Sequence, residues 1–240
     1  MSLNSHNLRI LLFDIDGTLL FTIHRSIYRA KVAEAVANIF GTAGKISQVS
    51  FSGKTDLHII SEALSDEGIT LKEIWEALPE IEKQFVSIIE TLSKTSAVFR
   101  SCPGMPGLLE KLQLDPRYQL SLLTGNIESL AKLKLNQVGL EKYFSCPGAF
   151  GSDHEDRLFL PSIAANRVAN FLGIFDLSPS QFIIIGDTPR DIACARHFGA
   201  KVLAVATGNF SKEELANAQP DLLFETLSDT DKVISALATL

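Results

Sequence analysis

The sequence lacks long apolar runs, basic clusters and paired cysteines, and each absence excludes a class of protein. No apolar stretch approaches the roughly 20 residues that cross a bilayer, so we expect no membrane partner. The net charge is −6 and no run of Lys or Arg is present, which argues against nucleic acid as a partner. Cys102, Cys146 and Cys194 lie far apart without CxxC pairing, so we expect reduced thiols instead of disulfides or a zinc site.

The N-terminus also lacks a basic start followed by an apolar run, so Met1–Asn4 do not predict a signal peptide. Together with the reduced thiols, this predicts a cytoplasmic protein. What is present is an ordinary globular composition, with 46% hydrophobic and 21% charged residues in a chain of 240. That length suits one core domain plus an insert. The sequence indicates no particular oligomeric state.

Four short apolar runs recur along the chain, and each ends in polar sequence. Continuous apolar runs of this length are typical of strands buried on both faces, as in a parallel sheet covered by helices. Helical patterns lie between them, one after Asn126, which can cap a helix running to Gly139. This alternation predicts an α/β fold with a doubly wound parallel sheet. The four runs are Leu8–Phe13, Gln119–Leu123, Phe182–Ile185 and Lys201–Ala206.

Residues 22–99 break this alternation, because their pattern is helical and contains no strong strand run. Thr70 and Glu73 have the spacing of a capping box, which starts one of these helices. We predict a small helical cap domain at 22–99, inserted into an α/β core domain made of residues 1–21 and 100–240. The expected helices cover Ser26–Phe40, the residues after Thr55, the residues after Thr70, and Glu80–Leu92.

Polar residues follow three of the apolar runs, at the points where the strands end. Ligands of an open α/β sheet bind outside the carboxyl ends of the strands, so these residues are expected to share one edge. Two like charges 4 Å apart repel by about 1 kcal/mol in water and about 4 kcal/mol at an effective dielectric of 20, so clustered acids need a cation. Hard oxygen ligands without His or thiolate favour Mg²⁺. The residues are Asp14 and Asp16, Thr124 and Asn126, and Asp187 and Asp191.

The segment from Asp14 to Thr18, DIDGT, allows two other interpretations. It can be an Asx-type turn that closes a strand. It can also begin an EF-hand loop, although its glycine is at the fourth position instead of the sixth, and Arg25 stands where the loop needs Glu. The functional interpretation is favoured because Asp14 and Asp16 have strand spacing and therefore share a face.

This segment matches DxDGT, the first motif of the haloacid dehalogenase superfamily, and residues 186–191, GDTPRD, match its acidic motif GDxxxD. The chain resembles this superfamily over essentially its whole length, and most closely the phosphoglycolate-phosphatase-like branch. The resemblance implies a Mg²⁺-dependent phosphatase that hydrolyses a small-molecule phosphate monoester. It implies that Asp14 is the nucleophile and forms an aspartyl-phosphate. Asp16 would protonate the leaving alcohol and then activate water.

The same resemblance implies two groups of binding residues. Thr124 matches the second motif, and a helix N-terminus at that point also favours an anion. Asp191 would lie in the first turn of a helix, where the dipole alone favours an acid. The implied phosphate-binding residues are Thr124, which also counts as catalytic, Gly125 and Asn126, and the implied metal ligands are Asp14, Asp16, Asp187 and Asp191.

The third motif departs from the family pattern. Relatives usually carry a lysine there, often as KPxP, which neutralises the nucleophile and the phosphate. No lysine lies between Phe150 and Ala165, and Arg157 is the best substitute as a catalytic and phosphate-binding residue. The alternative is a solvated Arg157 paired with Glu155 or Asp156.

Several functions share these core motifs. A haloacid dehalogenase uses the same nucleophile, but it needs neither a metal nor an acid such as Asp16. A sugar phosphomutase and a phosphonatase differ in the cap, and a non-catalytic phosphate-binding relative keeps the fold. Two-carbon phosphates, sugar phosphates and nucleotides all remain candidate substrates.

Two pairs in the predicted cap, His24-Arg25 and Lys54-Thr55, can reach a substrate, although Thr55 also suits a helix cap. Gly53-Lys54-Thr55 resembles the end of a Walker A loop. Gln48 stands where that loop needs glycine, which excludes an ATP site there.

Overall fold

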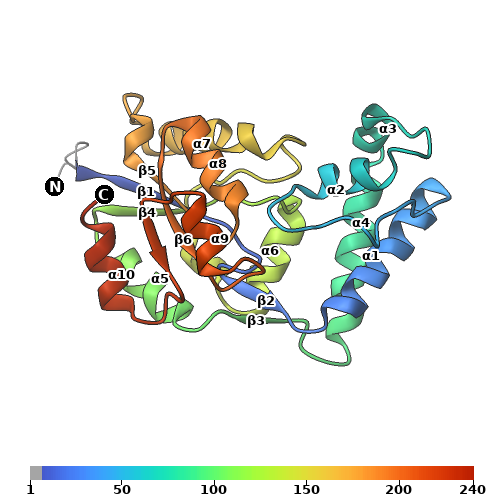
Figure 1. The fold of residues 1–240 in the computed structure, drawn as a ribbon, viewed down its shortest axis with the longest axis horizontal. Helices are drawn as coiled ribbons and strands as arrows, with labels where there is room; N and C mark the ends of the chain where they lie inside the picture. The colour runs from blue at the N-terminus through green and yellow to red at the C-terminus, as the bar shows by residue number, and fades with distance from the viewer. Residues whose placement is uncertain (1–6) are drawn as a thin grey trace.

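The computed structural model describes residues 7–240, and its centre is a parallel five-stranded sheet in the order β4-β1-β5-β6-β7 (Figure 1). Four of these strands coincide with the predicted apolar runs to within one residue at each end. The fifth strand, β7, does not correspond to a long apolar run and was not predicted. The strands are β1 (Arg9–Phe13), β4 (Tyr118–Leu122), β5 (Phe182–Gly186), β6 (Lys201–Val205) and β7 (Leu222–Phe224).

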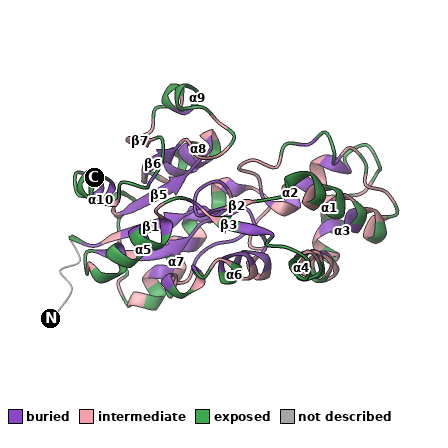
Figure 2. Cartoon of the chain, turned by 90° about the horizontal axis from the view of Figure 1, so that it is seen from below, coloured by how far each residue is buried: buried purple, intermediate pink, exposed green. Residues whose placement is uncertain are grey.

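Helices cover both faces of the sheet, because alternate side chains of the buried strands point to opposite sides. Leu11 and Phe13 of β1 belong to a core cluster with α5, α6 and α10, whereas Ile10 and Leu12 belong to a second cluster with α7, α8 and α9. Figure 2 shows the buried strands between helices that expose their outer sides. The doubly wound α/β fold is therefore confirmed. The core helices are α5 (Met105–Leu114), α6 (Glu128–Gln137), α7 (Leu160–Leu172), α8 (Pro189–Phe198), α9 (Lys212–Asn217) and α10 (Thr230–Leu237).

Residues 22–99 form the helices that lie to one side of the sheet in Figure 1. Pro79 lies in the first turn of α4, so the preceding helix, α3, ends before this proline. The Thr70–Glu73 capping box is present at the start of α3. The domain division at residues 22–99 stays a prediction. The helices are α1 (Arg25–Phe40), α2 (Asp56–Ala63), α3 (Leu71–Glu76) and α4 (Leu78–Ser93).

The chain enters and leaves this helical segment through a two-stranded antiparallel ribbon, which the sequence did not predict. β2 (Leu20–Thr22) pairs with β3 (Phe99–Ser101), so both crossing points are tied together by backbone hydrogen bonds. Three short 3₁₀ turns lie between the core helices and strands: η2 (Glu141–Tyr143), η3 (Arg157–Phe159) and η4 (Pro179–Gln181).

The expectations about membrane spans and about the cysteines can be compared with the structure. Among residues 7–240, no helix is both long and apolar enough to cross a membrane. Cys102, Cys146 and Cys194 are free and buried, as expected. The predicted absence of a signal peptide at Met1–Asn4 lies outside the described residues.

Candidate active site

Three buried carboxylates meet at the carboxyl edge of the sheet. Asp14 directly follows β1, and Asp187 directly follows β5. One oxygen from each of Asp14, Asp187 and Asp191 can be chosen so that all lie within 4.8 Å of one another. Burial, followed by the charges of Asp14 and Asp191, raises the pKa of Asp187 well above its usual range. The predicted acids at the two strand ends are therefore brought together, in a cluster that repels itself without a cation.

Two glycines allow the backbone to approach this cluster. Gly17 has φ +89°, and a Cβ there would lie 2.4 Å from Asp187 Oδ2. A Cβ on Gly208 would lie 1.6 Å from the same oxygen. Side chains at these positions would displace the Asp187 carboxylate, so the DIDGT loop and the loop after β6 both need glycine.

Arg157 is a buried counter-ion of the cluster. It lies in η3, and its Nη2 donates to Asp191 Oδ1 at 2.6 Å and lies 3.2 Å from Asp14 Oδ2. Its Nε is buried and has no hydrogen-bond partner among the described residues. Burial raises the pKa of Asp14 to about 6, and the positive charge of Arg157 opposes this rise. The structure thus places Arg157 beside the predicted nucleophile and not in a surface pair with Glu155 or Asp156.

Asp191 is already hydrogen-bonded through both carboxylate oxygens. Its Oδ1 accepts from Arg157, and its Oδ2 accepts from the backbone N–H of Thr188 at 3.0 Å and from Thr188 Oγ1 at 2.7 Å. The hydrogen bond from the Thr188 N–H to Asp191 is half of a capping box that starts α8. Asp191 can therefore contact a metal only through oxygens that it shares with these donors. Its role as a ligand, directly or through water, stays a prediction.

Thr124 follows β4 and is buried at the same edge of the sheet. Its Oγ1 accepts from the backbone N–H of Asn126 at 3.3 Å and from Asn126 Nδ2 at 2.8 Å. Because this oxygen is an acceptor in both contacts, the hydroxyl proton is left to donate elsewhere. Within residues 7–240, no group accepts a hydrogen bond from the N–H of Gly125. Two donors of the predicted phosphate loop are therefore available to a ligand.

The expectation that Asn126 caps the following helix is wrong. Helix α6 begins at Glu128, its N-cap is Ile127, and no side chain caps it. The Asn126 side chain instead forms hydrogen bonds with three other polar side chains of the site. Its Nδ2 donates to Asp16 Oδ2 at 2.8 Å as well as to Thr124, and its Oδ1 accepts from Lys134 Nζ at 2.6 Å.

Lys134 is the site residue that the sequence analysis missed. It lies on α6, is 3% exposed, and donates to Asp16 Oδ2 at 2.7 Å. A signal was present, because Lys134 follows Leu130 by four residues and Ala131 by three, on the stripe that α6 buries. A lysine on a buried stripe needs a partner, and that partner is the predicted acid–base residue.

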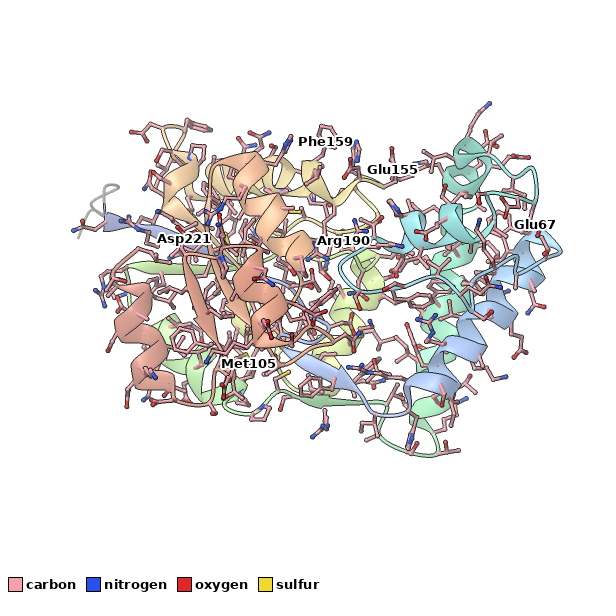
Figure 3. All side chains as sticks on the ribbon, viewed as in Figure 1. Glu67, Met105, Glu155, Phe159, Arg190 and Asp221 are labelled. Atoms are coloured by element: carbon pink, nitrogen blue, oxygen red, sulfur yellow. The ribbon has the colours of Figure 1, made fainter. Side chains whose placement is uncertain are left out.

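The loop before α2 is docked onto this edge of the core. Thr55 caps α2, and its Oγ1 also donates to the carbonyl of Glu155 at 2.6 Å. The Asp56 N–H donates to the Gly125 carbonyl, and Asp56 Oδ2 accepts from the Ile127 N–H, both at 2.8 Å. Figure 3 shows Glu155 on the side of the core that faces the helical segment. Burial raises the pKa of Asp56 to about 6.

A cavity of about 220 Å³ lies between the core loops and the helical segment. Asp14, Asp16, Thr124, Arg157 and Asp187 line it from the core. The helical segment and its loops contribute basic and aromatic side chains, among them Arg25, Arg29, Lys54, Tyr28 and Phe85.

All three of these basic side chains already have protein partners, and Arg29 Nη2 donates to the carbonyl of Val49 at 2.8 Å. Arg25 Nη1 donates to Asn209 Oδ1 at 2.6 Å, and Lys54 pairs with Glu62. His24, which was considered together with Arg25, is exposed and is not among the residues that line the cavity.

Comparisons with known proteins identify relatives of this chain. A family model for HAD-like hydrolases, described as "HAD-hyrolase-like", matches residues 159–230. "Probable phosphatase IndB" of Dickeya dadantii (strain 3937) is 23% identical, over 96% of this chain and 95% of the relative. "Phosphoglycolate phosphatase" of Vibrio cholerae serotype O1 is 24% identical, over 95% of this chain and 97% of the relative.

A solved structure, that of a predicted phosphoglycolate phosphatase from Haemophilus somnus 129pt, has a TM-score of 0.65. It is 20% identical and covers 95% of this chain and 98% of its own. At this identity the likeness shows a shared fold.

Proposed function

The chain belongs to the haloacid dehalogenase-like hydrolase superfamily, in its phosphoglycolate-phosphatase-like branch, and we propose that this phosphatase hydrolyses a small phosphate monoester with Mg²⁺ and an aspartyl nucleophile. The observation that supports the proposal most strongly is the convergence of Asp14, Asp187 and Asp191 around one point, with Arg157 beside Asp14. Phosphatases among the relatives support the same reaction class.

The carboxylate cluster fits a magnesium ion. Its donors are hard oxygens, as Mg²⁺ prefers, and no histidine or cysteine belongs to the cluster. Asp14 and Asp187 would be side-chain ligands, Asp16 would contribute its backbone carbonyl, and Asp191 would act directly or through water. Mg²⁺ bound there would neutralise the negative charge of the substrate phosphate and of the nucleophile.

In the first step, an oxygen of Asp14 attacks phosphorus and the bond to the leaving alcohol breaks. Asp16 gives its proton to the leaving oxygen, so the alcohol departs neutral. In the second step, water attacks phosphorus, Asp16 takes the proton from that water, and Asp14 is released with inorganic phosphate. Arg157 contributes fixed positive charge beside the attacking oxygen in both steps.

The phosphate would be held by donors that lack protein acceptors. Thr124 has its hydroxyl proton free and Gly125 its backbone N–H, as described above. Arg157 adds a third donor, because its buried Nε has no acceptor among the residues that the structure describes. Asn126 lies next to these groups, with its amide between Thr124 and Asp16.

The cavity favours a small substrate. Its volume of about 220 Å³ is below the roughly 300–1,000 Å³ of most sites for drug-sized ligands. A two-carbon phosphate or a sugar phosphate suits this volume better than a nucleotide does. A cytoplasmic location remains part of the proposal.

The direct test is phosphate release from a panel of phosphate monoesters, with Mg²⁺ and with a chelator. We expect turnover that requires Mg²⁺, and loss of turnover in Asp14→Asn with the fold preserved. Asp176→Asn, in an exposed loop, is the matched control and should keep wild-type activity. Absence of metal-dependent turnover on the whole panel would contradict the proposal and favour a non-catalytic phosphate-binding protein.

A further inference from the structure

Lys134 is a buried ammonium group next to the catalytic carboxylates. Its side chain is 4% exposed, and Nζ lies 2.7 Å from Asp16 Oδ2. The rings of Tyr28 and Phe99 lie near it, with centroids 5.7 and 5.6 Å from Nζ. A buried charge is unfavourable unless it is paired and hydrogen-bonded, so the position of this ammonium is set by Asp16 and Asn126.

Asp16 is held through only one of its two carboxylate oxygens. Oδ2 accepts from Lys134 Nζ at 2.7 Å and from Asn126 Nδ2 at 2.8 Å. In the part of the chain that the structure describes, no donor contacts Oδ1. The Asp16 side chain is 42% exposed and lines the cavity, so Oδ1 is the oxygen that remains for a substrate.

The two donors to Asp16 are also fixed relative to each other. Lys134 Nζ donates to Asn126 Oδ1 at 2.6 Å, which requires the Asn126 amide nitrogen to point toward Asp16 and Thr124. The residue that handles the proton and the residue that binds phosphate therefore belong to one hydrogen-bonded unit.

From this arrangement we infer that Lys134 is the positioning residue of Asp16: it holds Oδ2, so that Oδ1 is the atom that gives and recovers the proton. The inference rests on the proposed phosphatase reaction. In the first step, the proton on Oδ1 moves to the leaving oxygen as the phosphorus–oxygen bond breaks. In the second step, Oδ1 takes a proton from the attacking water. Arg157 and Lys134 thus have separate tasks, one at the nucleophile and one at the acid–base residue.

The contacts of Lys134 argue against direct substrate binding. An ammonium group has three donors. Two of them are used by Asp16 and Asn126, and the aromatic rings of Tyr28 and Phe99 lie near Nζ. Lys134 is among the residues that line the cavity, but both of its hydrogen bonds go to side chains of the site itself.

The test compares two aryl phosphates that differ in how much their leaving group needs a proton. 4-Nitrophenol leaves readily as an anion, whereas phenol needs protonation. In Lys134→Met, kcat/KM for phenyl phosphate should fall by about 10²-fold, the lower end of what general acid catalysis contributes. The fall for 4-nitrophenyl phosphate should be at least about tenfold smaller, because kcat/KM reports the first step only.

Lys132→Met is the matched control, since Lys132 lies on the same helix with its side chain 55% exposed. It should change neither value. Equal losses on both aryl phosphates in Lys134→Met, with an active wild type, would overturn the assignment and leave the proposed function intact. A wild type inactive on both would overturn the two together.

If Lys134→Met is less stable by thermal unfolding, the charge-balanced double variant Lys134→Met/Asp56→Asn replaces it. Asp56 is another carboxylate whose charge stabilises the Lys134 ammonium. The same difference between the two aryl phosphates is expected, and its absence would again overturn the assignment.

Discussion

Arg157 Nη2 lies 3.2 Å from Asp14 Oδ2, and both side chains are only 6% exposed. The same nitrogen donates to Asp191. One cation therefore links the predicted nucleophile to a second carboxylate of the cluster, at a position where the resemblance described above implies a lysine.

Replacing Arg157 with Met should lower kcat by about 10²–10³-fold, because this is the usual effect of removing one fixed charge or donor at a reaction centre. Arg157→Lys should keep more activity, since a single nitrogen makes both carboxylate contacts. Steady-state kinetics on one aryl phosphate would measure the difference. Arg117→Met, at an exposed pair with Asp115, is the control. Equal kcat in wild type and Arg157→Met would exclude the proposed role.

Thr124→Val removes a hydroxyl whose proton has no acceptor among the described residues. We expect kcat/KM to fall by about 10²-fold, because that proton would serve the phosphate. Thr226→Val, at an exposed position, should have no effect. A Thr124→Val enzyme that matches wild type would mean that phosphate is held by other groups.

Gly17→Ala should be more destabilising than Gly68→Ala, although both glycines have positive φ, +89° and +74°. A left-handed φ alone costs an L-residue roughly 1–2 kcal/mol. At Gly68 nothing lies within 4 Å of the added Cβ, whereas at Gly17 it would meet Asp187 Oδ2 at 2.4 Å. Urea unfolding should show the larger loss in Gly17→Ala, together with loss of activity only in that variant. Equal losses of stability would show that Asp187 moves aside freely.

Asp56→Asn should stabilise the protein relative to wild type as pH rises. Burial raises the folded pKa of Asp56 from 3.8 to about 6, so the folded state binds this proton more tightly than the unfolded chain does. Wild-type stability from this group is therefore complete below pH 4 and is lost as pH rises through 6. The difference between the free energies of unfolding should grow by on the order of 1–2 kcal/mol across that range.

Asp66→Asn is a control of opposite sign for this pH experiment. Hydrogen bonding to Lys45 lowers the pKa of Asp66, so its contribution is present at neutral pH and is lost in acid. Urea unfolding at pH 4 and pH 7 would compare the two variants. A difference between Asp56→Asn and wild type that does not change with pH would contradict the raised pKa of Asp56.

The strands and the acid cluster were accessible from sequence because both follow local rules. A buried parallel strand is a continuous apolar run, and polar residues at its end must lie at the edge of the sheet. Asp14, Thr124 and Asp187 were found in this way. The short edge strand β7 (Leu222–Phe224) escaped, because each of its residues is only partly buried and the run is brief.

The interactions that the sequence did not indicate are those between distant segments. Lys134 and Asp16 are 118 residues apart, so no local pattern pairs them. Asn126 lies just before α6 and was expected to cap that helix. Its amide forms hydrogen bonds with Asp16 and Lys134 instead. Contacts with distant residues, and not the local sequence, therefore determine whether this side chain caps the helix or forms hydrogen bonds within the site.

The most direct measurement asks whether phosphorus is attached to Asp14 during the reaction. The Asp16→Asn variant lacks both the acid of the first step and the base of the second, so it would be mixed with Mg²⁺ and 4-nitrophenyl phosphate, whose leaving group needs no proton. The reaction would be quenched in acid and analysed by peptide mass spectrometry. The account predicts a phosphoryl group on Asp14, and none in the Asp14→Asn/Asp16→Asn double variant. Substrate turnover by the wild type with phosphate never on Asp14, or with phosphate on another residue, would contradict it.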